Sequence, residues 1–187
     1  MIFLSALNFI RIKKDVDLLN EFILVILGSV VLAMSSQLSI ALKPVPITFQ
    51  TFVVLFIGMT YGWRLGGCAI VLYLFEGAIG LPVFANFSYG LPVLFGPTGG
   101  YLLGFIPATI AAGWLVEKVW AKNILGIFLA GIVGTLIIFV CGWLMLTSFV
   151  GIKNAYLFGV KPFLFIDIMK IISVTLLVPK SCRKNRT

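Results

Sequence analysis

The sequence predicts an all-α integral membrane bundle of six transmembrane helices, with both termini in the cytoplasm. Of the 187 residues, 61% are hydrophobic and 11% are charged, whereas soluble domains have about 45–50% apolar and about 25% charged residues. The apolar residues form six stretches, separated by proline, glycine or lysine. A chain of this composition lacks the polar residues needed to cover a surface in water, so lipid is its expected solvent.

The composition also excludes several classes of protein. With a mean hydropathy of +1.16, the chain is neither a soluble enzyme, nor an extracellular disulfide scaffold, nor a disordered segment. It has no histidine and no GxxxxGK[ST] loop, so it lacks the commonest zinc ligand and a phosphate-binding loop for ATP hydrolysis. Cys68, Cys141 and Cys182 form no closely spaced pair. We therefore expect no metal and no cofactor.

Residues 1–21 are expected to form a cytoplasmic or interfacial segment. The mostly apolar residues 1–10 come first, and the cations Arg11, Lys13 and Lys14 follow them, which reverses the order found in a signal peptide. Residues 22–179 are expected to form a single six-helix membrane domain, and residues 180–187 a basic cytoplasmic tail.

Segments that disfavour helix separate the six predicted spans. Residues 43–46 contain two prolines, residues 62–66 form a predicted tight turn, and residues 81–97 contain three prolines and no charge. The last segment is too broken for a helix and too apolar for an ordinary solvated loop. The predicted spans are residues 22–42, 47–61, 67–80, 98–116, 124–150 and 162–178, and a loop with two lysines precedes the last of them.

The basic residues orient this arrangement, because cytoplasmic loops of membrane proteins carry an excess of lysine and arginine. Three lysines fall on one side of the six spans, namely Lys43, Lys153 and Lys161. Ten cations fall on the other side: Arg11, Lys13, Lys14, Arg64, Lys118, Lys122, Lys180, Arg183, Lys184 and Arg186. The net charge of +8 is explained by topology, so we expect no nucleic-acid partner.

With this orientation, the proline-rich segments 43–50 and 81–97 face outward. Non-helical backbone at membrane depth is tolerated only where protein buries it or where it lines a cavity. We therefore predict a cavity in the outer half of the bundle, capped by these loops.

Three charged residues fall within spans, and all three are expected in the outer half. They are Glu76, Asp167 and Lys170, and the last two are three positions apart and share a helix face. Charged groups in a bilayer are costly and usually face a partner or a cavity. They could neutralise one another to fix the helices, form a proton relay, or bind a small molecule. Neutral polar and aromatic residues at the same level are Gln50, Thr51, Phe84, Asn86, Ser88, Tyr89 and Tyr101.

Four segments resemble the hallmark segments of the BioY family, the biotin-specific substrate-binding (S) components of energy-coupling factor (ECF) transporters. They are KPVPITFQT at 43–51, EGAIGLPVFA at 76–85, GPTGGYLLGF at 96–105 and KPFLFIDIMK at 161–170. The resemblance implies six membrane helices and a vitamin site near the extracellular side, capped by loops. It also implies a multi-pass protein of the cell membrane that associates with a T subunit and two ABC ATPases, which use the ATP.

The resemblance also assigns roles to residues of this chain. Asp167 would accept the ureido N–H groups of biotin, and Lys170 would bond the ureido carbonyl or stabilise Asp167. Asn86 would make a further polar contact from the cap. Expected neighbours of the ligand are Gln50, Glu76, Phe84, Tyr89 and Tyr101.

The first span contains a small-xxx-small step, Ser29 to Ala33, which allows close helix approach. Such steps commonly serve internal packing. In the family, a comparable AxxxA step meets the T subunit, so the resemblance implies that Ser29 and Ala33 contact that partner. The alternative functions are an intramembrane enzyme that uses Asp167 and Glu76, and an autonomous carrier of a related small molecule.

Overall fold

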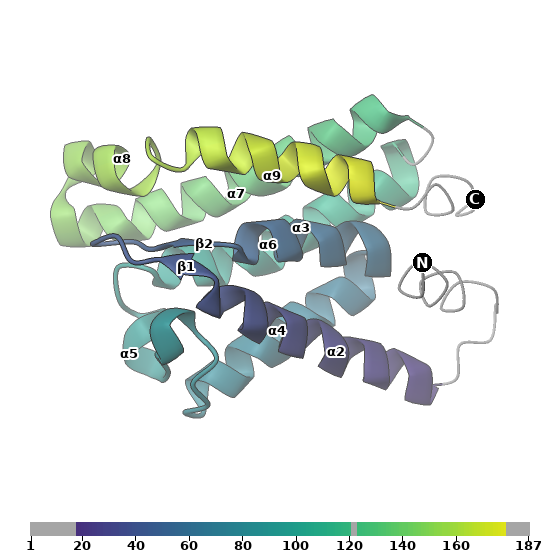
Figure 1. The fold of residues 1–187 in the computed structure, drawn as a ribbon, viewed down its shortest axis with the longest axis horizontal. Coiled ribbons are helices and arrows are strands. Elements are labelled where there is room, and N and C mark those ends of the chain that lie inside the picture. The colour runs from purple at the N-terminus through teal and green to yellow at the C-terminus, as the bar shows by residue number, and fades with distance from the viewer. Residues whose placement is uncertain (1–17, 121–122, 179–187) are drawn as a thin grey trace.

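The computed structural model describes residues 18–120 and 123–178, which form a bundle of long helices with one short β-hairpin (Figure 1). The long helices are α2 (Leu18–Gln37), α3 (Gln50–Tyr61), α4 (Trp63–Ala78), α6 (Gly99–Leu115), α7 (Ile124–Val150) and α9 (Leu164–Leu177). The shorter elements are β1 (Ser39–Ile40), β2 (Ile47–Thr48), η1 (Ala85–Phe87), α5 (Leu91–Leu94), η2 (Val116–Trp120) and α8 (Ile152–Gly159).

The prediction of an all-α membrane fold is confirmed, apart from the two-residue strands of the hairpin. Each predicted span overlaps one of the long helices. Three helical stretches are long and apolar enough to cross a bilayer by themselves, namely α2, α7 and residues 99–119, which join α6 to η2. Within the described residues, the chain therefore has several apolar spans.

The first span differs from its prediction at both ends. Helix α2 begins at Leu18, inside the segment predicted to precede the membrane, and it ends at Gln37 rather than at residue 42. Strands β1 and β2 then pair antiparallel, with Ser39 opposite Thr48 and Ile40 opposite Ile47. The helix stops early because the backbone of residues 38–40 pairs with residues 47–49 instead, and Pro44 and Pro46, which disfavour helix, lie in the turn between them. The Lys43–Pro44 peptide bond is cis.

Two connections are more helical than predicted. The turn predicted at 62–66 is reduced to Gly62, whose φ of 87° is accessible to glycine at low cost, so α4 starts at once. The predicted loop before the last span contains α8, which follows Gly151 at φ 79°. Its buried residues, Ala155 and Gly159, are four apart on one face, a helical spacing that the prediction overlooked.

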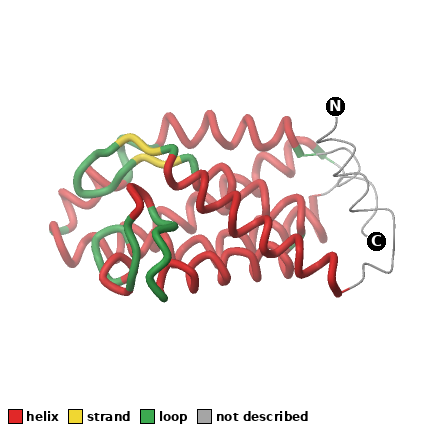
Figure 2. The backbone as a smooth tube through the Cα atoms, turned by 60° about the horizontal axis from the view of Figure 1, so that its bottom comes forward, coloured by secondary structure: helices red, strands yellow, loops and turns green. Residues whose placement is uncertain are grey.

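The segment 81–97, called the cap below, was predicted to be too broken for a helix. It contains the short elements η1 and α5, and Pro92 stands in the first turn of α5, where its missing N–H costs nothing. The cap, the hairpin and α8 gather at the same end of the bundle (Figures 1 and 2). The predicted basic tail and most of the predicted N-terminal segment lie outside the described residues.

Glycines let the central helices approach closely. A Cβ added at Gly104 on α6 would lie 2.9 Å from the Cβ of Cys141 on α7, and Gly100 faces the backbone of the same residue. Between α3 and α6, the corresponding contact is made by Gly58, where a Cβ would lie 2.7 Å from the carbonyl oxygen of Thr109. Helices that lie this close leave no room for side chains at the crossing points.

Two apolar clusters fill the bundle. The larger one surrounds Tyr73, Phe84, Phe105 and Phe163 at the end that holds the cap and the hairpin. The second lies between α3, α6, α7 and α9, around residues such as Leu55, Ile127 and Val174. The outer surface is also apolar, as shown by Phe165 of α9, which is 71% exposed. An apolar exterior around an apolar core is what a lipid solvent requires.

Replacing Gly58 by alanine should destabilise the fold by about 1–3 kcal/mol, because the new methyl group meets backbone that cannot move aside. The measurement is the thermal unfolding of purified protein in detergent. Gly67→Ala is the matched control, because its Cβ would meet the flexible Ile110 side chain at 3.3 Å. Equal unfolding temperatures for the two variants would contradict the close α3–α6 contact.

Candidate functional site

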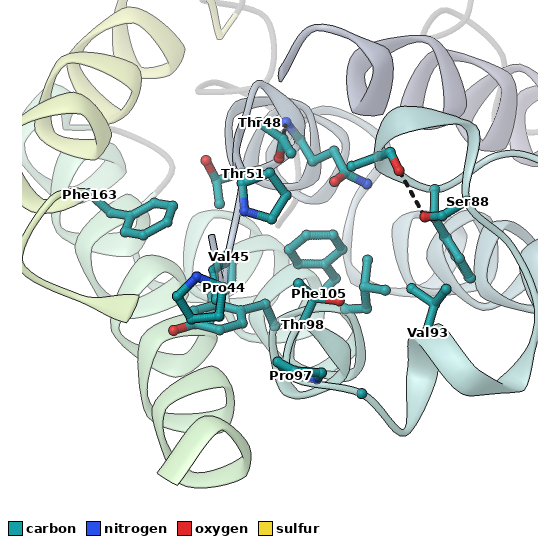
Figure 3. A pocket seen from close by; sticks show the side chains of 18 of the residues that line it. Pro44, Val45, Thr48, Thr51, Ser88, Val93, Pro97, Thr98, Phe105 and Phe163 are labelled. Atoms are coloured by element: carbon teal, nitrogen blue, oxygen red, sulfur yellow. Dashed lines mark hydrogen bonds between the residues drawn. The ribbon is translucent and has the colours of Figure 1, made fainter. Parts of the chain in front are cut away.

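A cavity of about 380 Å³ lies beneath the cap and the hairpin, within the size range of small-molecule sites. Helices α3, α6, α7 and α9 supply its other walls (Figure 3). The lining residues are Pro44, Val45, Pro46, Thr48, Gln50, Thr51, Phe84, Ala85, Asn86, Ser88, Pro92, Val93, Gly96, Pro97, Thr98, Tyr101, Leu102, Phe105, Ile138, Phe139, Phe163, Asp167 and Lys170. The predicted cavity beneath the proline-rich loops is therefore present.

A buried ion pair forms the polar wall of the cavity. Lys170 Nζ lies 2.6 Å from Asp167 Oδ1, and the two residues are 8% and 2% exposed. Their i,i+3 spacing on α9 puts them on one helix face, as predicted. Asp167 lies in the first turn of α9, where the positive end of the helix dipole favours a carboxylate.

The ammonium group of Lys170 is fully engaged within the protein. It donates to Asp167 Oδ1 at 2.6 Å, to Thr51 Oγ1 at 2.7 Å and to the backbone oxygen of Thr48 at 2.8 Å. An ammonium has three N–H donors, so none is left for a ligand in this arrangement. Of the two predicted roles for Lys170, the geometry favours the stabilisation of Asp167.

One carboxylate oxygen of Asp167 has no hydrogen-bond partner among the described residues of the protein. Thr51 Oγ1 donates to Oδ1 at 3.1 Å, but Oδ2 is buried and has no hydrogen-bond partner. An unpaired buried carboxylate oxygen is costly, and this one belongs to a residue that lines the cavity. A ligand that brought an N–H donor to this oxygen would relieve that cost.

Aromatic rings and prolines make the rest of the cavity apolar. The ring of Phe163 lies 6.4 Å from the rings of both Tyr101 and Phe139, and Phe105 lies on another wall (Figure 3). Tyr101 is held in place by its hydroxyl, which donates to the backbone oxygen of Gly159 at 2.8 Å. These walls suit an apolar ring or chain next to the polar acceptor.

A second polar chain connects the helices to the cap. Gln50 Nε2 donates to the hydroxyl of Tyr73 at 2.7 Å, and that hydroxyl donates to the backbone oxygen of Val83 at 3.1 Å. The adjacent Phe84 is buried, packs edge-on against Tyr73 and inserts its ring against Gly77, where no Cβ would fit. Gln50 and Phe84 therefore line the cavity and also anchor the cap.

Six of the predicted contact residues line the cavity: Gln50, Phe84, Asn86, Tyr101, Asp167 and Lys170. The other two lie elsewhere. Glu76 accepts a hydrogen bond of 2.7 Å from Ser29 Oγ, which joins α4 to α2. Tyr89 is 59% exposed and lies outside the cavity lining.

The small-residue step from Ser29 to Ala33 packs within the chain itself. Ser29 is fully buried and bonds to Glu76, so its small side chain serves the contact between α2 and α4. Ala33 is partly buried and packs against the larger apolar cluster. Ser29 therefore serves internal packing, and a contact of the step with a T subunit stays a prediction.

The prediction missed the part played by Thr51, which was noted only as a nearby polar residue. It accepts from Lys170 and donates to Asp167, so it links α3 to α9. Its position next to Gln50 in KPVPITFQT was the available signal. Phe105, Phe139 and Phe163 were also missed, because nothing in an apolar chain distinguishes a cavity wall from the core.

A helical bundle with an apolar exterior, and a cavity that combines one buried acceptor with aromatic walls, defines a membrane-embedded small-molecule-binding protein. Residues 9–187 match the BioY family. The chain belongs to this family.

Named relatives agree with this assignment. A probable biotin transporter BioY of Pyrococcus horikoshii is 38% identical over 161 residues, which cover 86% of this chain and 95% of that protein. The biotin transporter BioY of Thermotoga maritima is 40% identical over 148 residues, covering 78% and 86%. The biotin transporter BioY2 of Lactococcus lactis is 38% identical over 160 residues, covering 84% and 87%.

The fold also matches a crystal structure described as the S-component for biotin from an ECF-type ABC transporter. The TM-score is 0.81 at 21% identity, and the match covers 94% of this chain and 96% of that one. The S-component-like fold is thus confirmed. The chain is a multi-pass component of a membrane transporter and not an enzyme.

Removing one partner of the Asp167–Lys170 ion pair should destabilise the protein more than removing both charges. Lys170→Met leaves a buried carboxylate without its cation, which should lower the stability by about 3–5 kcal/mol. The double variant Asp167→Asn/Lys170→Met, which carries no charge at the site, should recover most of that loss. Thermal unfolding in detergent measures both effects. A double variant as unstable as Lys170→Met would contradict the coupling.

Proposed function

We propose that this chain captures biotin from the outer side of the membrane and passes it inward as the S component of an ECF-type transporter. The unpartnered Oδ2 of buried Asp167 carries this proposal. Biotin has a ureido ring with two N–H donors, and a thioether ring and alkyl chain that are apolar. The carboxylate would accept the ureido N–H groups, while the rings of Tyr101, Phe139 and Phe163 would cover the apolar parts.

Six membrane spans with both termini in the cytoplasm complete the proposed topology. The first residue of α2, the last of α9 and the α3–α4 turn lie at the end opposite the cap (Figure 1). The sequence assigns ten of its lysines and arginines to that side, which the positive-inside rule makes cytoplasmic. The cavity then opens toward the outer face. The short helices α3 and α9 would cross with the help of their flanking segments.

We infer that transport requires a T subunit and two ABC ATPases, because the sequence has no phosphate-binding loop. The intramembrane enzyme considered as an alternative needed Asp167 and Glu76 in one site. Glu76 instead pairs with Ser29 outside the cavity. An autonomous carrier remains the second candidate, since the cavity geometry alone suits it equally.

Purified protein in lipid nanodiscs should bind tritiated biotin saturably, at nanomolar to micromolar concentration, without ATP. Asp167→Asn should weaken binding about 100-fold or more, because it exchanges a charged acceptor for a neutral amide. Lys118→Gln, an exposed change in η2, is the control and should bind like the unmodified protein. Equal affinities for the two variants would mean that the site is elsewhere.

Uptake of biotin by cells should depend on the proposed partners. Cells that express this chain together with a T subunit and two ABC ATPases should accumulate labelled biotin, and cells that express the chain alone should only bind it at the surface. The comparison is made in a host without its own biotin uptake. Accumulation by the chain alone would instead establish the autonomous carrier.

A further inference from the structure

The cap contains a strained turn directly beside the cavity. Asn86 and Phe87 have φ values of 56° and 55°, in the left-handed region. Asparagine tolerates this region, whereas a bulky aromatic residue such as Phe87 rarely adopts it. Strain of this kind persists only where surrounding contacts hold it. The turn is closed by a hydrogen bond of 3.1 Å from the backbone N–H of Phe84 to the oxygen of Ser88.

The contacts that hold this turn come from the last residues of α2. Ser36 Oγ donates to the backbone oxygen of Val83 at 2.7 Å. Gln37 Nε2 donates to the backbone oxygen of Phe84 at 3.0 Å, and Gln37 Oε1 accepts from the backbone N–H of Phe87 at 3.1 Å. One side-chain amide thus bridges the two ends of the η1 turn, as a neighbouring strand would.

The orientation of the Gln37 amide is fixed by its partners. A backbone carbonyl only accepts and a backbone N–H only donates, so a flipped amide would lose both bonds. A further bond of 2.8 Å, from Nε2 to Ser36 Oγ, fixes the amide against its own helix. Gln37 is itself outside the cavity lining, whereas Phe84, Asn86 and Ser88, which it brackets, all belong to it.

We propose that Gln37 is a positioning residue for the ligand cavity: its side-chain amide holds the strained turn Phe84–Ser88 closed over the cavity and presents Asn86 to the ligand. That the ligand is biotin rests on the proposed function, whereas the role of the Gln37 amide in holding the η1 turn does not. Without the amide, the strained turn relaxes, the cap opens more often and the bound ligand escapes faster. Association is affected less, because an open cap admits the ligand.

The test replaces Gln37 by methionine, which keeps the length of the side chain and removes all three hydrogen bonds of the amide, two of them to the turn. In nanodiscs without ligand, hydrogen–deuterium exchange of peptides that span residues 84–90 should be about tenfold faster, as the loss of one or two hydrogen bonds implies. Dissociation of tritiated biotin into excess unlabelled biotin should also be about tenfold faster, with association changed less than about threefold. Ser39→Ala is the matched control, because its contact with Asn86 Oδ1 is long, at 3.4 Å.

A second variant separates positioning from general folding. Adding Phe87→Asn to Gln37→Met replaces the residue that tolerates the left-handed region least with one that tolerates it well, so dissociation should slow toward the unmodified rate. Three results would overturn the proposal. In the first, Gln37→Met exchanges and releases biotin at the rates of Ser39→Ala; in the second, hydrogen–deuterium exchange rises in α2 and α4 as much as in the cap. In the third, adding Phe87→Asn does not slow the dissociation of biotin. Failure of the unmodified protein to bind biotin would reject the proposed function instead, and the exchange measurement would still decide the role of Gln37.

Discussion

The buried pair of Asp167 and Lys170 is the interaction on which the site depends. Two charges inside an apolar bundle are stable only if they face each other and their remaining hydrogen-bonding atoms are satisfied. Here Thr51 and the backbone oxygen of Thr48 complete the shell of the ammonium, which ties α9 to α3 and to the hairpin. The carboxylate keeps one free oxygen, so the protein retains an electrostatic cost that a ligand with N–H donors can relieve.

The two sides of the cavity differ in how firmly they are held. The acceptor Asp167 lies on α9, which packs closely against α7 where Gly131 faces Ile171, so its position is fixed by the packing of the bundle. The opposite side is a strained turn, held by side chains at the end of α2 and by the insertion of Phe84 against Gly77. The polar wall is therefore held by helix packing, and the turn of the cap is held by a few side-chain contacts.

Most of the helices and the cavity could be predicted from the sequence, because few backbone structures are stable in a bilayer. Apolar stretches indicated the helices, and the proline-rich breaks indicated a cavity beneath them. Asp167 and Lys170 were identified because charged residues are unusual within an apolar span, and Asn86 was identified from the resemblance to the BioY family. Glu76 was just as unusual, but its partner, Ser29, is 47 residues away in the chain. The place of Glu76 on a helix was predictable, whereas the direction in which α4 turns this side chain was not.

The sequence by itself determined the membrane environment, the succession of helices and the charged pair on one face of α9, because each follows from local composition or from helical spacing. Only the tertiary structure decided how the polar groups are shared. It showed that the three donors of Lys170 are engaged, that one oxygen of Asp167 is not, and that Gln37 bridges the η1 turn. These pairings join segments far apart in the chain, and their partners are set by how the helices pack.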